Sequence, residues 1–252
     1  MSPFVPTRRA VLAGGFAALA AAPALAAPSP ADASAWIDYE ARLRARLADA
    51  GGGRFDEAAA AEVLALTNRV RAEAGVSPVA WHDELADAAR AHAADLAHRR
   101  YIEHLSPEKF DPSHRFWLLG RRTIGSPSEN IAYHRGGAAH ATPDQLLRIW
   151  RGSPQHWKNL LRPTHTHAAF GLARAGDRDY LVGLYARPAA RMGEPLPFRP
   201  TEEAFARALR SIPAAHKPGV STPQGTRWAR ADGPPVVCRS RSNGLWTRER
   251  TS

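Results

Sequence analysis

Two histidines and a glutamate in the middle of the chain could do chemistry together. They are His104, Glu129 and His156, and they lie in the short polar segments His104–Pro107, Ser128–Ala132 and Ser153–Leu161. Small or turn-forming residues flank each of them, which is typical of loops that present a polar side chain. We therefore expect the three segments to bring these side chains to one cleft.

Three kinds of site fit this set of side chains. Two neutral imidazoles, His104 and His156, can hold a divalent metal with an open position, with Glu129 beside them. A histidine and a glutamate can instead form a hydrogen-bonded acid–base pair. The same residues can also form a buried polar network that only fixes the three loops. Asn130 and Asn159 are expected to supply hydrogen bonds around the site, and the spacing alone does not choose between these possibilities.

The charge of the chain is high but unevenly distributed. The 252 residues carry a formal net charge of +10. Residues 57–190, where the expected site lies, contain 17 basic and 14 acidic side chains, whereas residues 191–252 contain 11 basic and 5 acidic ones. A nucleic-acid-binding face needs basic residues clustered on the folded domain, so we expect no nucleic-acid partner.

The N-terminus has the features of an export signal. Arg8 and Arg9 precede an apolar run over residues 11–22, and Ala24-Leu25-Ala26 offers small residues at the positions that a signal peptidase reads. The pattern predicts a twin-arginine signal peptide over residues 1–26 and a periplasmic or extracellular protein. The apolar run is too short to span a bilayer, so we expect no transmembrane anchor.

Apolar periodicity predicts helices up to residue 161. They are expected to begin near Ala35, Asp56, His82, Asp111 and Thr142. Asp56, Asp111 and Thr142 are typical N-caps, and a proline follows the last two. Residues 27–56 are therefore interpreted as a linker with a short N-terminal helix that leads into, or packs on, the main domain.

After residue 167 the pattern changes to strands. The short apolar runs 169–173 and 180–186 are separated by Gly176–Asp179, which predicts a β-hairpin. Helices first and a hairpin last favour an α+β fold, in which helices cover an antiparallel sheet, over residues 57–190. The remainder, 191–252, is rich in proline and arginine, and we expect a basic, largely disordered tail with one helix near residues 202–209.

The other histidines and the cysteine have simpler interpretations. His92 falls on the apolar face of a helix and is expected to be a satisfied, half-buried residue. His165 and His167 are expected to be surface histidines rather than half of a metal site. Cys238 is the only cysteine, so no intramolecular disulfide can form and the fold must be stable through burial alone.

In their order along the chain, these segments resemble the CAP superfamily, which includes cysteine-rich secretory proteins, wasp-venom allergens and plant pathogenesis-related proteins. The matching elements are Leu66–Arg71, Leu85–Ala97, His104–Pro107, Arg115, Glu129–Ala132, Trp150 and Ser153–Leu161. The resemblance covers residues 57–187. It implies an α-β-α sandwich of the CAP (SCP) type, with a central cleft lined by two histidines and usually two acidic residues.

His104, Glu129 and His156 match three of these four cleft residues. The second acid has no clear match, and Glu108 or Asp111 lies nearest in the sequence. A metal held by two histidines and one glutamate would have to recruit water or a ligand. Two neighbours also depart from the family, with Ser128 in place of the usual glycine and Trp157 in place of the usual arginine.

The resemblance leaves the activity open, because members are linked to lipid or sterol binding, metal-dependent binding, antimicrobial action and occasionally proteolysis. The sequence has no nucleophile elbow, cysteine nucleophile or complete zinc motif. We therefore expect a monomeric, non-catalytic module that binds a small ligand, a lipid, an envelope component, or zinc or magnesium. The alternative is a metal-assisted hydrolase of peptide or envelope polymer with Glu129 as base. Ser106 and Ser153 precede prolines and are expected to shape turns.

Overall fold

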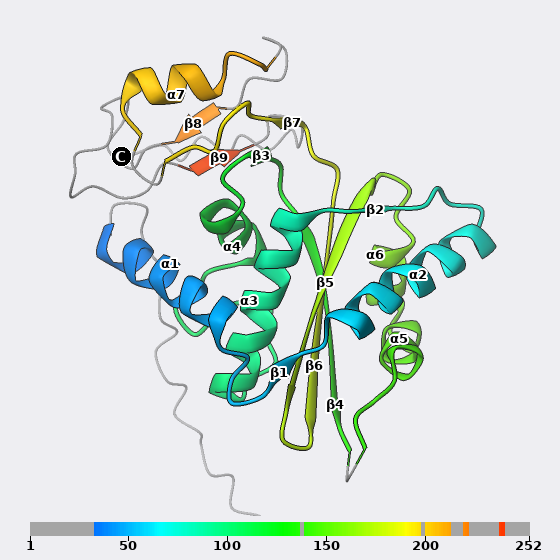
Figure 1. Ribbon diagram of the computed structural model, residues 1–252. Coiled ribbons are helices and arrows are strands. Elements are labelled where there is room, and N and C mark those ends of the chain that lie inside the picture. The colour runs from blue at the N-terminus through cyan, green and yellow to red at the C-terminus, as the bar shows by residue number, and fades with distance from the viewer. Residues whose placement is uncertain (1–32, 137–138, 198–199, 213–218, 222–236, 240–252) are drawn as a thin grey trace, which may run out of the picture.

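The computed structural model describes residues 33–136, 139–197, 200–212, 219–221 and 237–239 (Figure 1). The predicted signal peptide and most of the chain beyond residue 212 lie outside this part. The helices are α1 (Ala33–Ala48), α2 (Glu57–Glu73), α3 (Asp83–Arg99), α4 (Pro112–Leu119), α5 (Pro143–Arg151), α6 (Pro154–Leu160) and α7 (Glu202–Ala208). The strands are β1 (Arg54–Phe55), β2 (Ala80–Trp81), β3 (Thr123–Ile124), β4 (Ser128–Arg135), β5 (His167–Ala175), β6 (Arg178–Ala186), β7 (Ala190–Arg191), β8 (Gly219–Ser221) and β9 (Val237–Arg239).

A mostly antiparallel sheet forms the centre, with the strand order β1-β5-β6-β4 and β2 paired in parallel with β5. The predicted hairpin is confirmed as β5 and β6, with Ala175 opposite Arg178 across a two-residue turn. Gly176 has φ +60 in that turn, a conformation that favours glycine. Strand β4 was not predicted from the sequence, which placed Glu129 at the end of a loop. It pairs with β6 from Ser128 to Arg135 and forms an edge of the sheet.

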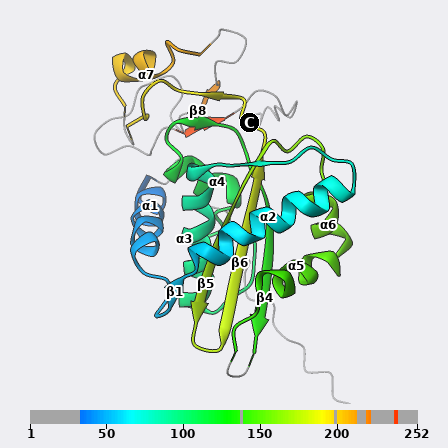
Figure 2. The same cartoon turned by 45° about the vertical axis from the view of Figure 1, so that its right-hand side comes forward.

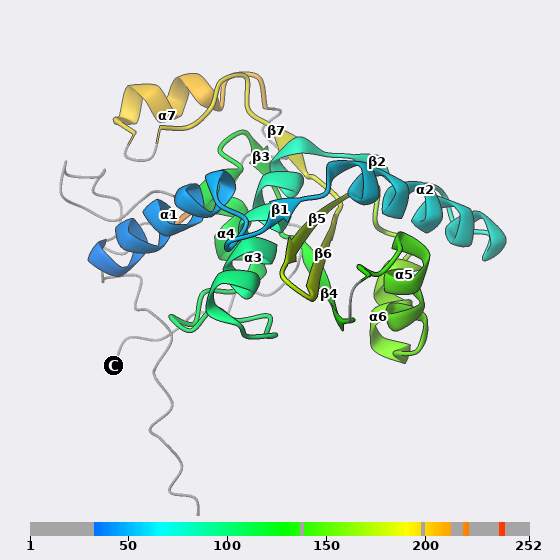
Figure 3. The same ribbon diagram turned by 60° about the horizontal axis from the view of Figure 1, so that its bottom comes forward.

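Helices cover both faces of the sheet (Figures 2 and 3). Alternate residues of the central strands point to opposite sides, and both sets are buried. On one side Ala169, Val182 and Leu184 pack with α3, α4 and α1. On the other side Phe170 and Leu181 pack with α2, α5 and α6. The α+β fold expected from the sequence, with its sheet covered by helices, is therefore confirmed.

Helix α3 lies unusually close to the sheet because its contact face is made of alanines. Ala88, Ala89 and Ala91 are fully buried. Opposite them, Gly171 on β5 has no room for a side chain, since an added Cβ would lie 2.4 Å from the backbone nitrogen of Arg90. This close packing fixes the position of the loop that follows α3, which carries His104.

The predicted N-caps are confirmed by the structure. The side chains of Asp56, Asp111 and Thr142 accept hydrogen bonds from backbone amides three residues further along. Each bond satisfies one of the amides that a helix start leaves without an intrahelical partner.

The N-terminal helix α1 is part of the folded body. Trp36, Tyr39 and Leu43 are buried against α3 and α4. The Tyr39 ring stacks on Phe110 with a centroid distance of 4.1 Å. Of the two positions that the sequence allowed for this helix, the structure therefore shows the one in which it packs on the domain.

The domain extends further towards the C-terminus than residue 190. Strand β7 pairs with β3, and Met192, Leu196 and Phe205 form a small buried cluster with Ile124. The predicted helix near residues 202–209 is confirmed as α7. Residues 191–197 and 200–212 are folded, with their few apolar side chains buried together, and most of the remaining part of the predicted disordered tail lies outside the described residues.

Candidate functional site

The loop between α3 and α4 places His104 at the surface. Helix α3 ends with Arg100 in a left-handed conformation, φ 55, which turns the chain away from the helix axis. Ser106 closes the loop, since its backbone amide donates to the carbonyl of Phe110 and its hydroxyl accepts from the amide of Phe110. Ser106 is 1% exposed and shapes this turn, which leaves His104 with a side chain that is 52% exposed.

Glu129, near the start of edge strand β4, lies beneath His104. Its side chain is 1% exposed, and both of its carboxylate oxygens have cationic or imidazole partners. Arg115 Nη2 donates to Oε2 at 2.8 Å, and His104 Nδ1 donates to Oε1 at 2.8 Å. His92 Nε2 lies 3.9 Å from Oε1. Burial alone would raise the pKa of Glu129, but the charge of Arg115, the nearby His92 and the bond from His104 outweigh it and lower the pKa to about 2.

Arg115 links the carboxylate to the His104 loop. It comes from α4, is fully buried, and donates to the carbonyl oxygens of His104 and Phe110 as well as to Glu129. Burial would lower the pKa of this guanidinium, but the adjacent Glu129 raises it, so the pair is ionised. Arg115 therefore holds both the backbone and the hydrogen-bond acceptor of His104.

His156 approaches the same edge strand from the other layer of helices. It lies in the first turn of α6, and its carbonyl oxygen accepts a hydrogen bond of 2.9 Å from Asn130 Nδ2. Asn159 Nδ2 donates to Asn130 Oδ1 at 3.0 Å, and Ser128 Oγ donates to Asn159 Oδ1 at 2.8 Å. The expected roles of Asn130 and Asn159 agree with this geometry, because the two amides tie α6 to β4.

The two histidines have pKa values shifted in opposite directions. The hydrogen bond to Glu129 is the largest effect on His104 and raises its pKa. Burial lowers the pKa of His156, and the charge of His104 lowers it further. His156 makes no ring hydrogen bond with the described residues, and its buried Nδ1 has no partner there.

Comparison with known proteins agrees with this fold. Residues 64–185 match the family described as "CAP: Cysteine-rich secretory protein family". The segment is a CAP domain. The superfamily expected from the order of the sequence motifs is thus confirmed.

Two curated relatives come from Bacillus subtilis. The uncharacterized protein YkwD is 32% identical over 117 residues, which cover 46% of this chain and 42% of YkwD. The uncharacterized membrane protein YlbC is 27% identical over 113 residues, which cover 45% of this chain and 31% of YlbC. The chain thus spans less than half the length of either relative.

Solved structures with similar folds include an outer surface protein from Borrelia burgdorferi, with a TM-score of 0.47 and 16% identity over 54% of this chain and 98% of that one. An extracellular protein containing a SCP domain from Bacillus anthracis has a TM-score of 0.44 and 25% identity, covering 52% of this chain and 41% of that one.

Two residues of the CAP site were not recognised from the sequence as parts of it. His92 is fully buried, and its Nε2 donates to the carbonyl oxygen of Glu103 at 3.0 Å. Burial, followed by the charge of Arg115, lowers the pKa of His92 to about 4, so it is neutral beside Glu129. The sequence placed His92 on the apolar face of α3 and Arg115 among the family matches, but neither pattern shows that both face Glu129.

The two acids considered for the fourth cleft position lie in other interactions. Glu108 forms ion pairs with Arg42 and Arg99, and the carboxylate of Asp111 caps α4. In the described residues there is no group of three or more His, Cys, Asp or Glu side chains arranged to hold a metal ion.

The expectation that His165 is a surface histidine is wrong. It is 6% exposed, stacks on Tyr185 with a centroid distance of 5.5 Å, and places Nε2 3.2 Å from Ser128 Oγ. Burial lowers its pKa to about 4. Ser128, which replaces the usual family glycine, therefore links His165 and Asn159 beside the site. His167, at the start of β5, is half-buried.

No helix within the described residues is both long and apolar enough to cross a membrane.

Proposed function

We propose that this CAP domain is a non-catalytic binding module that holds a divalent metal or a small ligand between His104 and His156. The observation that supports the proposal is that the two histidines are held by adjacent residues of edge strand β4, while ring nitrogens of both have no partner. Glu129 binds the ring of His104, and Asn130 binds the backbone carbonyl of His156. His104 Nε2 and both ring nitrogens of His156 make no hydrogen bond with the described residues. Ring nitrogens that are oriented but unpaired are suited to bind a ligand.

Glu129 orients His104 and does not serve as a ligand itself. Its two oxygens accept hydrogen bonds from Arg115 and His104, and its side chain is 1% exposed, so it is poorly placed to reach a cation bound at the surface. An ionised carboxylate only accepts hydrogen bonds, so Nδ1 of His104 carries a proton, and in the neutral imidazole Nε2 keeps its lone pair. Because Glu129 raises the pKa of His104, a metal at Nε2 would compete with a proton there. Histidines that bind metals commonly donate their other ring nitrogen to a carboxylate in this way.

This donor set fits zinc better than magnesium. Imidazole nitrogens suit zinc and related transition metals, whereas magnesium requires several oxygen ligands in octahedral geometry. His104 and His156 would supply two ligands, and water or a bound ligand would supply the others. Bound zinc would act as a Lewis acid towards such a ligand.

The test is calorimetric titration of the full chain, freed of metal, with zinc and separately with magnesium. We expect zinc binding by the native protein and by His98→Ala, a control that removes an exposed histidine on α3. The double variant His104→Ala/His156→Ala should not bind zinc, and no protein should bind magnesium at the site. Equal zinc binding by the native protein and the double variant would contradict the proposal.

The alternative, a metal-assisted hydrolase of peptide or envelope polymer, needs a base. A carboxylate with a pKa of about 2 that is already paired with Arg115 is a weak base near neutral pH, so Glu129 is poorly suited to activate water. Turnover of a peptide or glycan panel that is abolished both by a chelator and by His156→Ala would establish this alternative. The absence of turnover, together with zinc binding, favours the binding module.

We also propose that the chain is exported by the twin-arginine route. The support is the sequence, with Arg8 and Arg9 before the apolar run at residues 11–22. Replacing both arginines by lysine should leave the protein uncleaved in the cytoplasm. Unchanged cleavage after Ala26 in that variant would instead indicate the general secretory route.

A further inference from the structure

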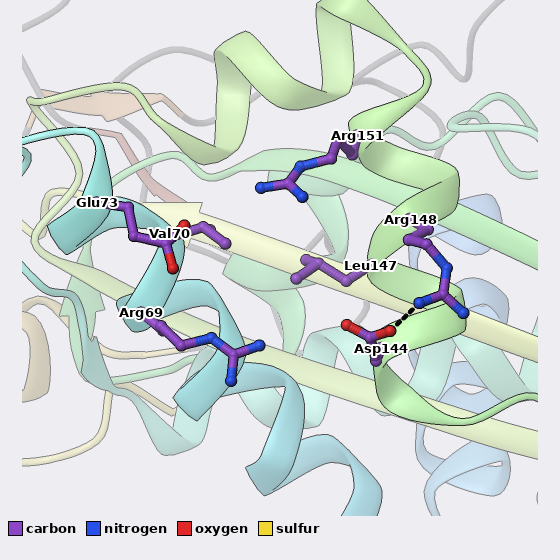
Figure 4. Close-up of a pocket in the computed structure, with 7 residues that line it drawn as sticks. All are labelled: Arg69, Val70, Glu73, Asp144, Leu147, Arg148 and Arg151. Atoms are coloured by element: carbon purple, nitrogen blue, oxygen red, sulfur yellow. Dashed lines mark hydrogen bonds and ion pairs between the residues drawn. The ribbon is translucent and has the colours of Figure 1, made fainter.

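A small pocket lies between α2 and α5, in the helical layer opposite the Arg115–Glu129 ion pair (Figure 4). Its volume is about 90 Å³, and three arginines line it: Arg69 from α2, and Arg148 and Arg151 from α5. The pocket shares no residue with the His104 site. A ligand bound in this pocket would therefore be separate from one bound at the His104 site.

The three arginines differ in their contacts, and Arg69 and Arg151 keep N–H groups available as hydrogen-bond donors. Arg69 makes no hydrogen bond or ion pair with the described residues. Arg151 lies over the Trp157 ring with its guanidinium carbon 4.9 Å from the centroid. Such stacking restrains a guanidinium while its N–H groups, which lie in its plane, stay available. Figure 4 shows Arg69 and Arg151 extending towards the space between the helices, while Arg148 pairs with Asp144.

The floor of the pocket is apolar. Val70 and Leu147, each 5% exposed, lie between the arginines and the core. These side chains offer no hydrogen-bond acceptor to the guanidinium groups. A ligand that reaches the floor would lose water on that side, which strengthens its electrostatic attraction to the arginines.

The charges around the pocket favour an anion. Three guanidinium groups face two carboxylates, those of Asp144 and Glu73, and Asp144 is already paired with Arg148. We propose that this pocket binds a phosphate group, either as free phosphate or as the phosphate ester of a lipid headgroup. Arginine matches phosphate oxygens in a bidentate manner, and a tetrahedral group has acceptor oxygens in enough directions to meet donors from two helices. The volume suits a group of this size and not an extended chain.

The test is calorimetric titration of the full chain with inorganic phosphate at constant ionic strength. Arg69→Gln and Arg151→Gln should each weaken phosphate binding about tenfold or more, because each removes charge-assisted hydrogen bonds. Glu73→Gln should strengthen binding, since it removes an opposing charge. Arg207→Gln, a matched control on the exposed face of α7, should have no effect.

A second experiment distinguishes the source of the phosphate group. Vesicles of anionic phospholipid are compared with vesicles of neutral phosphatidylcholine. Binding to anionic vesicles alone, lost in Arg69→Gln and Arg151→Gln, assigns a headgroup, whereas phosphate binding without vesicle binding assigns free phosphate. The proposal is overturned if the native chain binds neither, or if both arginine variants bind like Arg207→Gln. The variant His104→Ala/His156→Ala should keep its phosphate affinity, so the two proposals fail separately.

Discussion

Replacing Glu129 by glutamine tests whether the site rests on its buried ion pair. Glutamine keeps the shape of the side chain but removes the charge that balances Arg115, which is fully buried. Lowering the pKa of Glu129 from 4.5 to about 2 corresponds to about 3 kcal/mol of stability at neutral pH. Removing one partner of a buried ion pair costs about 3–5 kcal/mol. We therefore expect Glu129→Gln to lower the free energy of unfolding by about 3 kcal/mol at pH 7.

The expected loss depends on pH in a defined direction. The pKa of Glu129 is lower in the folded than in the unfolded chain, so its contribution is fully present above about pH 4.5 and decreases as the pH falls towards 2. Urea unfolding of the metal-free native protein and of Glu129→Gln, followed by circular dichroism at pH 7, 4.5 and 3, measures the difference. The two stabilities should approach each other at the lowest pH.

Two further variants separate the ion pair from general effects of substitution. Glu73→Gln removes an exposed carboxylate and should change stability by less than about 0.5 kcal/mol. Adding Arg115→Met to Glu129→Gln should recover part of the lost stability, because no unpaired buried charge remains, although the hydrogen bonds from Arg115 to the carbonyls of His104 and Phe110 are lost. A loss below about 1 kcal/mol for Glu129→Gln, or a loss of equal size at pH 7 and pH 3, would refute the reasoning.

Three other perturbations test the framework around the site. Arg71→Met should cost about 3 kcal/mol in urea unfolding. The buried guanidinium donates hydrogen bonds to the carbonyls of Ser77, Leu160 and His165, and methionine cannot donate to these carbonyls. Asp179→Asn should cost about 3 kcal/mol at pH 7 and less at pH 3. Burial would raise the pKa of this carboxyl, but the hydrogen bonds from the amide of Ala141, from Arg174 and from His134 outweigh it and lower the pKa; an unchanged midpoint would contradict this. Gly171→Ala should lower the melting temperature by several degrees through its clash with α3, whereas Gly152→Ala, where a Cβ has room, serves as its control.

Local signals in the sequence were sufficient to predict most helices and the hairpin. The caps at Asp56, Asp111 and Thr142 and the turn at Gly176 act within a few residues, so their chemistry can be read directly from the chain. Strand β4 was missed because Ser128–Arg135 has polar residues at both ends and only a short apolar centre. Its strand conformation depends on pairing with β6, which lies about 50 residues further along the chain.

Sequence motifs named candidate residues of the site but not the contacts between them. His104 contacts Glu129 on β4, and the backbone of His156 contacts the adjacent Asn130, but the contacts of Arg115 and His92 with Glu129 depend on how α3 and α4 pack. The burial of His165 has a similar cause, because the Ser128 and Asn159 side chains that contact it come from β4 and α6. Residue type and spacing do not carry this information.

The position of the site follows from the edge location of β4. In a sandwich of helices, sheet and helices, loops from the two helical layers are separated by the sheet everywhere except at its edges. Glu129 and Asn130 are consecutive residues, so their side chains point to opposite faces: Glu129 holds His104 and Arg115 on one side, and Asn130 holds the backbone of His156 on the other. A slip of one residue in the β4–β6 register would exchange these faces and place a carboxylate against α6. Strand register therefore decides which β4 residue meets His104 and which meets the backbone of His156. Ile131 and Ala132 fix this register, because they are buried in the two separate cores.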